Sequence, residues 1–599
     1  MYSFANRVAA SFNRRYRGTF ARAYGRVAKN SLAKIHGAYN NSNNIKFLPV
    51  LSAVAALGYL GNNSADNCGI VGVVGSDDSS KYLLEGLFVL RNRGYDSAGM
   101  ATISKSGELQ ISKYASLNTT SDSIDRLKEN SAHHIGTSTG IAHTRWATHG
   151  GRTDENAHPH NDYGNRVAVV HNGTINNSFD LRAELTKQGI KLTSETDTEV
   201  IAHLIGLQLD MGYDTKDAVA RALKKCDGSW GLAVMNKEHP DEIVVACNGS
   251  PMVIGIGNGK TYIASETSAF SRYTKNFISL KDGEIGVVGS KSTSLDISRV
   301  EVAPDHEVLL TPHPYKHFTM KECREQPESI ARAMSYGARM SDDKVILGGL
   351  DMNKQKMADI HNLVLTACGT SKYAAELGAK IMRDLACFDT VSVMDSAEVR
   401  RCDIPHKSGG ILAVSQSGET KDVVRAVKTA QEEGVTCMSV VNTVGALIPR
   451  LTGIGVYLNA GREHAVASTK AFTSQVTVLT LIALWFRQMR EETNPSLGAS
   501  AATKEFRDAL QRLPISFGMA FRLQDKCKAI AKELDSSHSL FVLGKGYGEP
   551  IALEGALKLK EIGYIHAEGC SGGALKHGPF ALIEGTHSPL LDFLLNGSC

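Results

Sequence analysis

The sequence predicts two kinds of fold in one chain: an α+β domain with sheets packed on each other, followed by α/β modules with parallel sheets. From Cys68 to about residue 300, short β-branched runs alternate with glycine turns, and two helical stretches interrupt them. From residue 361, apolar strands alternate with helices, as parallel sheets require. A chain of 599 residues is also too long for one core, so two to four domains are expected.

The strands predicted for the first domain, residues 68–300, are apolar runs bounded by glycine or asparagine. Examples, in chain order, are "CGIVGVVG", "RVAVVHNG", "GLAVMN", "EIVVACNG", "MVIGIG" and "EIGVVG". The two helical stretches are residues 81–91 and 196–212. Residues 301–360 are polar and mixed in character, and we interpret them as a linker with a helix after Pro327.

The first α/β module is expected over residues 361–520. It opens with "HNLVLTACGTSKYAAELGAKIMRDL", an apolar strand, a glycine turn and a helix, and "GGILAVSQSGETKDVVRAVKTAQEEG" repeats this plan. A second copy is expected over residues 527–599, because "SLFVLGKGYGEPIALEGALKLKEI" has the same layout. A doubly wound module needs four or five strands, and this stretch provides about two. We therefore expect the second module to be truncated.

Residues 1–67 form a basic leader. Residues 1–65 carry nine Lys and Arg and no Asp or Glu, so the rest of the chain has 57 basic against 62 acidic residues and a net charge of −5. Such a leader is typical of an organelle transit peptide, and its apolar run, residues 47–60, is short for a membrane span. A mitochondrial-type leader, an upstream region without function and a retained anchor remain alternatives. We expect removal of the leader, no stable membrane insertion and, from the mildly acidic body, no nucleic-acid binding.

The eleven cysteines are scattered singly, without a C-x-x-C pair or a histidine cluster at metal-ligand spacing. This pattern favours a reducing compartment and predicts neither a disulfide framework nor a metal site. The glycine spacing of "GKGYG" (544–548) does not fit a dinucleotide loop, so no organic cofactor is expected.

Cys68 is the candidate nucleophile of the first domain. An isolated cysteine is more often a buried, inert residue. Three later motifs change that interpretation: "HTRWATHGG" (143–151), "HNGTI" (171–175) and "SETDTEV" (194–200). Together they provide the groups that a thiolate attack on an amide needs.

Four residues of these motifs have defined chemical uses. Asn172 can offer a side-chain amide, and Gly173 a backbone N–H, to the oxyanion that forms on the attacked carbonyl. Arg145 can pair with the α-carboxylate of an amino-acid substrate and Asp197 with its α-ammonium.

The base that takes the thiol proton has two candidates. His149 is one. A free α-amino group, with a pKa of about 7.7–8.0, would serve better at neutral pH, and this requires Cys68 to become the first residue of the chain. We therefore expect cleavage between Asn67 and Cys68.

Two hydroxyl-rich turns follow neighbouring strands of the first α/β module. "AVSQSGET" (413–420) ends a strand at a helix start, and "CGTS" (368–371) does the same. A serine-rich turn is more often only a helix cap. Helix N-termini also attract anions, and two adjacent turns of this kind favour a phosphate site.

The motifs "CGIVG", "RGYDSAG", "HTRWATHG", "HPH", "HNG" and "SETDTE" occur in an order that resembles the glutaminase domain of the glutamine–fructose-6-phosphate aminotransferase family. The resemblance covers residue 68 to about residue 289 and implies an α+β N-terminal-nucleophile glutaminase domain. It implies that Cys68 is the nucleophile and that Asn172 and Gly173 form the oxyanion hole. The residues implied to hold glutamine are Arg145, Trp146, Thr148, His149 and Asp197.

The later motifs "CGTS", "SQSGET", "VASTKAFTSQ", "ALEGALKLKEI" and "LKHGP" resemble the sugar isomerase (SIS) modules of the same family. The residues implied to bind fructose 6-phosphate are Ser371, Ser415, Gln416, Ser417, Thr420, Val466 and Ser468, with Lys470 at the edge of the pocket. Glu561 is implied to move a proton between C1 and C2, and Lys558 and His577 to assist isomerisation and ring opening. Without the resemblance, Lys558 and Glu561 would be interpreted as a surface ion pair at i,i+3.

The resemblance implies transfer of the amide nitrogen of glutamine to fructose 6-phosphate, giving glucosamine 6-phosphate and glutamate, the first step of hexosamine and UDP-N-acetylglucosamine synthesis. It also implies a homodimer, a cytoplasmic location and no cofactor. A glutaminase-only enzyme and a regulatory paralogue are alternatives. The family's Schiff-base lysine lies near its C-terminus and has no counterpart here, so the expectation for residues 68–599 is glutamine hydrolysis with little glucosamine 6-phosphate.

Overall fold

The computed structural model describes residues 68–91, 94, 96–117, 122–146, 150–257, 259–303, 311–341, 344–494, 501–535, 537, 539–582 and 590–593. The predicted leader lies outside the described residues. The expected cleavage at Asn67–Cys68 therefore stays a prediction.

The first domain is built from two antiparallel sheets. In the part of the chain that the structure describes, one sheet has the strand order β13-β11-β9-β10-β1-β4-β2-β3 and the other the order β12-β8-β7-β6-β5. The strands of the first sheet are β1 (Gly69–Val74), β2 (Ser97–Ile103), β3 (Leu109–Ala115), β4 (Gly140–Arg145), β9 (Val253–Ile256), β10 (Thr261–Ala264), β11 (Asn276–Ser279) and β13 (Glu301–Val302). Those of the second are β5 (His160–Asn161), β6 (Val167–Ile175), β7 (Gly228–Asn236), β8 (Glu242–Asn248) and β12 (Ile285–Gly289).

Alternation of apolar side chains along the strands explains how these sheets stack. Successive strand residues point to opposite faces. On β6, Ala168 and Val170 join Ile70 of β1 in a core between the sheets, while Val167 and Val169 pack under helices. The helices on the second sheet are α6 (Ser178–Lys187), α7 (Asp197–Asp210) and α8 (Thr215–Leu223), and those on the first sheet are α4 (Ser79–Val89) and α5 (Ser123–Glu129). The predicted α+β domain with packed sheets is confirmed.

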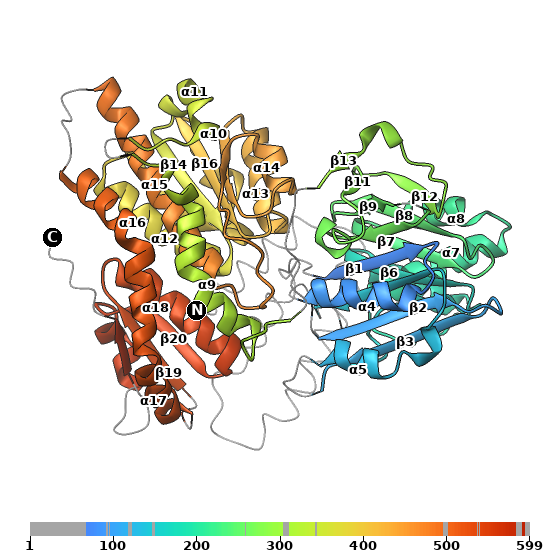
Figure 1. Ribbon diagram of the computed structural model, residues 1–599. Helices are drawn as coiled ribbons and strands as arrows, with labels where there is room; N and C mark the ends of the chain where they lie inside the picture. The colour runs from blue at the N-terminus through green and yellow to red at the C-terminus, as the bar shows by residue number, and fades with distance from the viewer. Residues whose placement is uncertain are drawn as a thin grey trace, which may run out of the picture. The chain divides into compact units, whose positions relative to one another are not determined.

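The first α/β module contains a parallel sheet in the order β15-β14-β16-β17-β18. Its strands are β14 (Asn362–Ala367), β15 (Thr390–Asp395), β16 (Gly409–Ser415), β17 (Thr436–Val441) and β18 (Gly455–Tyr457). One face packs against α9 (Phe318–Ala333), α12 (Gly369–Asp384) and α15 (Lys470–Thr493), and the other against α13 (Lys421–Glu432) and α14 (Leu447–Thr452). Figure 1 shows α12 and α15 beside β14 and β16. The predicted doubly wound parallel sheet is confirmed.

The helix predicted to start after Pro327 in fact begins at Phe318, so that prediction is wrong. Pro327 lies inside α9 and cannot donate a backbone hydrogen bond there. Ile330 and Ala333 on the same helix are fully buried in the core of the first module, and this packing stabilises the helix beyond the proline. Two short helices, α10 (Gly348–Asp351) and α11 (Lys354–Ala358), follow before β14.

The second α/β module has three parallel strands among the described residues, in the order β20-β19-β21. They are β19 (Ser539–Gly544), β20 (His566–Ser571) and β21 (Leu590–Phe593), and the helices α16 (Ala501–Ala520), α17 (Gln524–Leu534) and α18 (Gly548–Gly563) accompany them. The sequence had suggested about two strands for this module. The structure corrects that number, because β21 pairs with β19 as a third strand, from Phe541–Leu590 to Gly544–Phe593.

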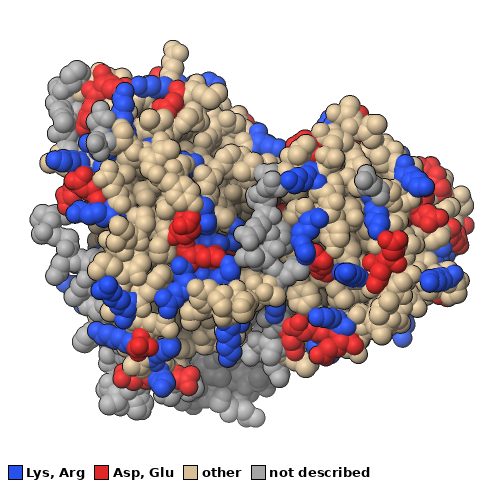
Figure 2. Space-filling model, viewed as in Figure 1, with Lys and Arg blue, Asp and Glu red and all other residues tan. Residues whose placement is uncertain are grey.

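Acidic and basic side chains are interspersed on the face of the molecule drawn in Figure 2. This mixture agrees with the near balance of 57 basic and 62 acidic residues beyond residue 65. No helix in the described ranges is long and apolar enough to cross a membrane.

The contact between α12 and α15 leads to a prediction about stability. A Cβ at Gly378 would lie 2.9 Å from the Cβ, 3.0 Å from the Cδ1 and 3.3 Å from the Cγ of Leu479, a fully buried residue. Gly378→Ala should therefore lower the melting temperature, because overpacking of about 1–3 kcal/mol exceeds the gain of about 1 kcal/mol in helix propensity. Leu479→Ala removes the last two of these atoms, Cδ1 and Cγ. In a double-mutant cycle followed by thermal unfolding, Leu479→Ala should cost less in the Gly378→Ala background than in the parent.

Gly555 on α18 provides the matched control. The atom nearest to a Cβ at that position is Cγ1 of Val542 at 3.9 Å. Gly555→Ala should therefore leave the melting temperature unchanged or raise it. Equal effects of the two glycine substitutions would contradict the proposed steric cause.

Candidate functional site

Cys68 lies immediately before β1, the strand between β4 and β10 in the first sheet. Because Gly69 pairs with Thr144 of β4, the thiol lies beside the end of β4 and the residues that follow. The backbone N–H of Trp146 donates to the Cys68 Sγ at 3.3 Å. An N–H donor of this kind stabilises negative charge on the sulfur.

Asn172 and Gly173 lie near the end of β6 and face this thiol-bearing residue. The Nδ2 of Asn172 donates to the carbonyl oxygen of Cys68 at 2.9 Å, and its side chain is buried. Gly173 has a φ of 145°, and a Cβ there would lie 2.0 Å from the carbonyl oxygen of Ser229. Only glycine fits this position, and the backbone can therefore turn its N–H toward a ligand.

A buried cation and a buried anion complete the arrangement. Arg145 ends β4, and burial lowers its pKa, while the nearby Cys68, Asp96 and Asp197 counteract that effect. Asp197 is the first residue of α7, where the helix dipole stabilises a carboxylate, and its Oδ2 accepts the backbone N–H of Ile175 at 2.8 Å. A zwitterionic amino acid needs one cation and one anion, and this site offers both.

The structure thus brings Cys68, Asn172, Gly173, Arg145 and Asp197 together, with Trp146 half-buried beside them. Thr148 and His149, which were predicted to hold glutamine, lie outside the described residues. Their roles stay predictions.

The first parallel sheet explains the position of the two hydroxyl-rich turns. β14 and β16 are neighbours in register, with Val364 opposite Ile411, so the turns after them lie side by side. Within the second turn, Ser415 Oγ accepts the backbone N–H of Gly418 at 3.0 Å, and Ser417 Oγ accepts that of Glu419 at 3.2 Å.

Thr420 directly precedes α13, and its side chain makes no capping hydrogen bond to that helix. Its Oγ1 lies 3.3 Å from Ser415 Oγ. The unpaired N–H groups and the dipole at the start of α13 attract an anion, and the Thr420 hydroxyl is placed to add a donor.

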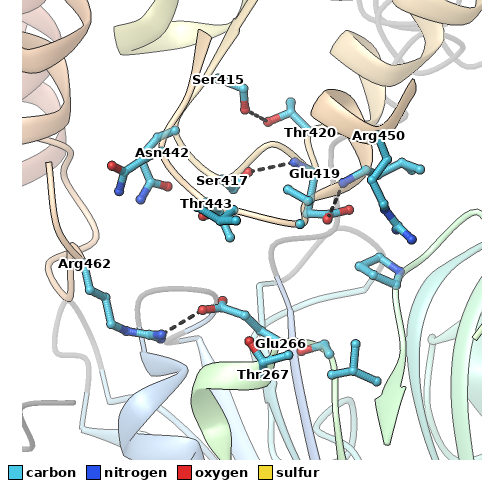
Figure 3. Close-up of a pocket in the computed structure, with 18 of the residues that line it drawn as sticks. Glu266, Thr267, Ser415, Ser417, Glu419, Thr420, Asn442, Thr443, Arg450 and Arg462 are labelled. Carbon is cyan, nitrogen blue, oxygen red and sulfur yellow. Dashed lines mark hydrogen bonds and ion pairs between the residues drawn. The ribbon is translucent and has the colours of Figure 1, made fainter. Parts of the chain in front are cut away.

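A cavity of about 1400 Å³ opens in front of these turns. Figure 3 shows Ser415 at the end of β16, Ser417 and Thr420 in the turn that follows, and Asn442 and Thr443 after β17 around this space. Every predicted sugar-phosphate residue lines it, namely Ser371, Ser415, Gln416, Ser417, Thr420, Val466 and Ser468, and Lys470 does so too. Across the cavity, Arg462 Nη1 donates to Oε1 of Glu266, a residue of the first domain, at 2.7 Å.

Two buried carboxylates that the sequence analysis missed hold the loop carrying Val466 and Ser468. Glu463 accepts the hydroxyl of Ser468 at 2.9 Å and the backbone N–H of Thr469 at 2.8 Å. Glu322 of α9 accepts the backbone N–H of Ala465 at 3.0 Å. Burial, with a further contribution from Glu463, raises the pKa of Glu322 to about 7.

Lys558 of α18 contacts the "CGTS" turn. Its Nζ donates to Thr370 Oγ1 at 3.0 Å, next to Ser371, and to Glu561 Oε2 at 2.6 Å. The predicted i,i+3 ion pair therefore exists, and a contact with the "CGTS" turn accompanies it. His577 is exposed on a 3-10 turn, and neither Lys558, Glu561 nor His577 is among the residues that line the cavity.

Glu554 is a further residue that sequence reasoning missed. Its Oε1 accepts the Thr370 hydroxyl at 3.2 Å and lies 3.3 Å from Lys558 Nζ. Burial raises its pKa to about 7, against the opposing effect of Lys558. The signal in the sequence was its spacing, because residues 554, 558 and 561 lie on one face of a helix.

No group of three or more His, Cys, Asp or Glu residues in the described ranges is arranged to hold a metal ion. The expectation that no cofactor takes part stays a prediction.

Comparisons with known proteins match both parts of the chain. Residues 143–272 match the model of a glutamine amidotransferase domain, and residues 356–485 and 533–587 match that of the SIS domain. Proteins named glutamine–fructose-6-phosphate aminotransferase (isomerizing) are similar to it: that of Bacteroides thetaiotaomicron is 37% identical over 527 residues, 86% of this chain and 84% of the relative. Those of Chlorobaculum tepidum and Pyrococcus horikoshii are 38% and 39% identical over the same shares.

The raised pKa of Glu322 predicts a pH-dependent stability. Between its ordinary pKa of 4.5 and the folded value of about 7, the folded state binds more protons than the unfolded state. The contribution of Glu322 to stability is therefore fully present below pH 4.5 and is lost as the pH rises to about 7. Glu322→Gln has no carboxyl to titrate and therefore avoids this loss. The difference in melting temperature between Glu322→Gln and the parent should be more positive at pH 8 than at pH 5. The change should be about 3–6 °C if the variant recovers roughly 1–2 kcal/mol of unfolding free energy.

The matched control is Glu328→Gln on the same helix, because the Glu328 side chain is 55% exposed. Its melting temperature should follow that of the parent at both pH values. Parallel pH profiles for Glu322→Gln and Glu328→Gln would contradict the assignment of this pH dependence to Glu322.

Proposed function

The chain belongs to the glutamine–fructose-6-phosphate aminotransferase (isomerizing) family, and from this membership we propose that it transfers the amide nitrogen of glutamine to fructose 6-phosphate, giving glucosamine 6-phosphate and glutamate. One observation carries the proposal: the same chain holds a cysteine beside an amide donor and a hydroxyl-lined cavity at the start of α13. The alternatives of a glutaminase-only enzyme and a regulatory paralogue are not favoured, because the relatives are named for the whole reaction.

In the proposed first step, Arg145 pairs with the α-carboxylate of glutamine and Asp197 with its α-ammonium. The Cys68 thiolate attacks the side-chain carbonyl carbon, and the oxyanion accepts hydrogen bonds from Asn172 Nδ2 and the Gly173 N–H. The C–N bond breaks, ammonia leaves with the proton taken from the thiol, and water hydrolyses the thioester to glutamate.

The α-amine of Cys68 is our proposed base for this step. It forms when the chain is cleaved after Asn67, and its ordinary pKa allows it to accept a proton at neutral pH. Trp146, Thr148 and His149 are proposed to complete the glutamine pocket. The cytoplasm is the compartment we propose from the family, and targeting by the basic leader is not part of the proposal.

In the proposed second step, the hydroxyls of Ser371, Ser417 and Thr420 and the start of α13 bind the phosphate of the sugar. Ammonia adds to the C2 carbonyl and water leaves, which gives an imine at C2. Glu561 then moves a proton from C1 to C2 with assistance from Lys558, which leaves an amine at C2 and an aldehyde at C1. The contact between Lys558 and Thr370 supports a place for α18 at the sugar site.

His577 is proposed to assist ring opening in a homodimer. Its exposure in a single chain supports a site that two chains share.

The experiment that tests the proposed first step is substitution of the nucleophile. Cys68→Ala should abolish glutamine hydrolysis, because it removes the thiol that lies beside Asn172 and Trp146 and is proposed to form the thioester. Binding of fructose 6-phosphate and use of free ammonia should remain within about twofold of the parent, since the residues proposed for those two functions do not include Cys68. Glutamate release and glucosamine 6-phosphate formation measure the two activities.

Cys402→Ala is the control, because Cys402 is an exposed free cysteine. It should retain both activities. Glutamine hydrolysis by Cys68→Ala would overturn the proposed mechanism, and parallel loss of every activity would indicate misfolding instead.

The phosphate site predicts a second result. Thr420→Val keeps the shape of the side chain and removes its hydroxyl. A hydroxyl that donates to a charged oxygen contributes about 1.5–3 kcal/mol, so the Kd for fructose 6-phosphate should rise about 10- to 150-fold without a change in glutaminase activity. Calorimetric titration of the sugar phosphate measures this change.

Thr429→Val is the matched control at the other end of α13. The Thr429 hydroxyl donates to the carbonyl oxygen of Arg425 in the same helix. This variant should bind the sugar phosphate as the parent does. An unchanged affinity in Thr420→Val would contradict the proposed contact between the Thr420 hydroxyl and the phosphate.

A further inference from the structure

His143 of β4 is a fully buried histidine behind the oxyanion-hole residue Asn172. Its Nε2 lies 3.0 Å from Asn172 Oδ1 and 3.1 Å from the carbonyl oxygen of His171. A backbone carbonyl can only accept a hydrogen bond, so Nε2 must carry the proton. The Asn172 atom that faces it is consequently the oxygen.

This assignment fixes the direction of the Asn172 amide. With Oδ1 toward His143, the NH2 group points the other way, toward Cys68, where Nδ2 donates to the carbonyl oxygen at 2.9 Å. The terminal torsion of an asparagine is broad, so the side chain alone does not select this orientation. The reverse orientation would present a lone pair to an oxyanion and repel it.

The end of β6 is also held from its other side. His171 Nε2 lies 3.2 Å from the carbonyl oxygen of Ser229, so that nitrogen too carries its proton, and His171 Nδ1 accepts from the Thr198 hydroxyl at 2.9 Å. Thr198 Oγ1 in turn accepts from His158 Nε2 at 2.8 Å. The rings of His158 and His143 stack with centroids 4.2 Å apart.

A role for His143 as general base does not fit its surroundings. Burial lowers the pKa of His143 to about 3, with further lowering by Arg145, so the ring is neutral and a poor proton acceptor at neutral pH. Its proton on Nε2 is already used in the contacts with Asn172 and His171. His143 is therefore a fixed, uncharged hydrogen-bond donor.

We propose that His143 is a positioning residue for the glutaminase reaction: its Nε2–H holds Asn172 Oδ1 so that the Asn172 amide N–H is aimed at the oxyanion. The inference rests on the proposed chemistry of Cys68. It assigns to the buried ring an effect on the transition state that a residue needed only for packing would not have.

Two substitutions of similar size at His143 separate the effect of its N–H donor from the effect of its side-chain packing. His143→Gln keeps an N–H donor near the position of Nε2, and His143→Met does not. In the full chain, the kcat of glutamine hydrolysis should fall about 10²- to 10³-fold in His143→Met, the usual loss when an oxyanion donor is removed. The KM for glutamine should stay within about threefold, and His143→Gln should retain kcat within about tenfold of the parent.

An aldehyde analogue tests the oxyanion directly. Glutamate γ-semialdehyde adds the Cys68 thiol across its C=O bond, so that a C–S bond forms and the former carbonyl oxygen occupies the oxyanion position. Its affinity should fall with kcat in His143→Met, whereas the affinity of glutamate, which forms no such adduct, should not change. Equal losses of both affinities, equal effects of Gln and Met, or an unchanged kcat in His143→Met would each overturn the proposal.

Folding and the proposed function are checked in the same series. Melting temperature and fructose 6-phosphate affinity should match the parent in both variants. If His143→Met does not fold, His143→Asn replaces it, because its amide is one carbon too short to reach Asn172 and the same fall in kcat is expected. A parent chain without glutamine hydrolysis would overturn the proposed function and this inference together, whereas a fully active His143→Met would overturn only the inference.

Discussion

The pairing of β1 with β4 is the constraint on which the glutaminase site depends. It places Cys68 beside Arg145 and Trp146, because Gly69 and Thr144 are partners in the register. The fit has little tolerance: a Cβ at Gly69 would lie 2.7 Å from Thr144 Oγ1 and 2.9 Å from Leu90 Cβ. A slip by one residue would also exchange the side chains that β1 buries on its two faces, Ile70 and Val74 on one and Val71 and Val73 on the other, so core packing and the site share one register.

The hydroxyl-lined cavity depends on a different rule, the common direction of parallel strands. β14, β16 and β17 end at one edge of the sheet, and the turns after them gather hydroxyl and amide groups there. The loop carrying Val466 and Ser468 is then held by Glu322 and Glu463, which come from α9 and from the loop itself. The turns after β14, β16 and β17, which short sequence motifs predict, line one side of the cavity. The loop on another side depends on the Glu322 and Glu463 carboxylates.

The sequence was sufficient to predict β1, β6, β7, β8, β9 and β12 of the first domain, because β-branched runs between glycines have few other structures available to them. It did not predict the other strands of these sheets, among them β2, β3 and β4. It was also sufficient for the motif residues that line the cavity and for the grouping of Cys68 with Asn172, Arg145 and Asp197. It could not predict Glu322 or Glu554, since a glutamate on a helix resembles any solvent-exposed acid until its burial is known. The start of α9 and the strand β21 were missed for a related reason: packing and strand pairing with distant residues decide both.

The neutral histidines behind Asn172 have an electrical consequence. Burial keeps the pKa of His143 near 3 and that of His158 well below its usual value, so neither ring gains charge over the ordinary range of cellular acidity. A charged imidazolium so close to Arg145 would repel that guanidinium and would change the electric field at the thiol. Because both rings stay neutral, mild acidification leaves their contribution to the electric field at the Cys68 thiol constant.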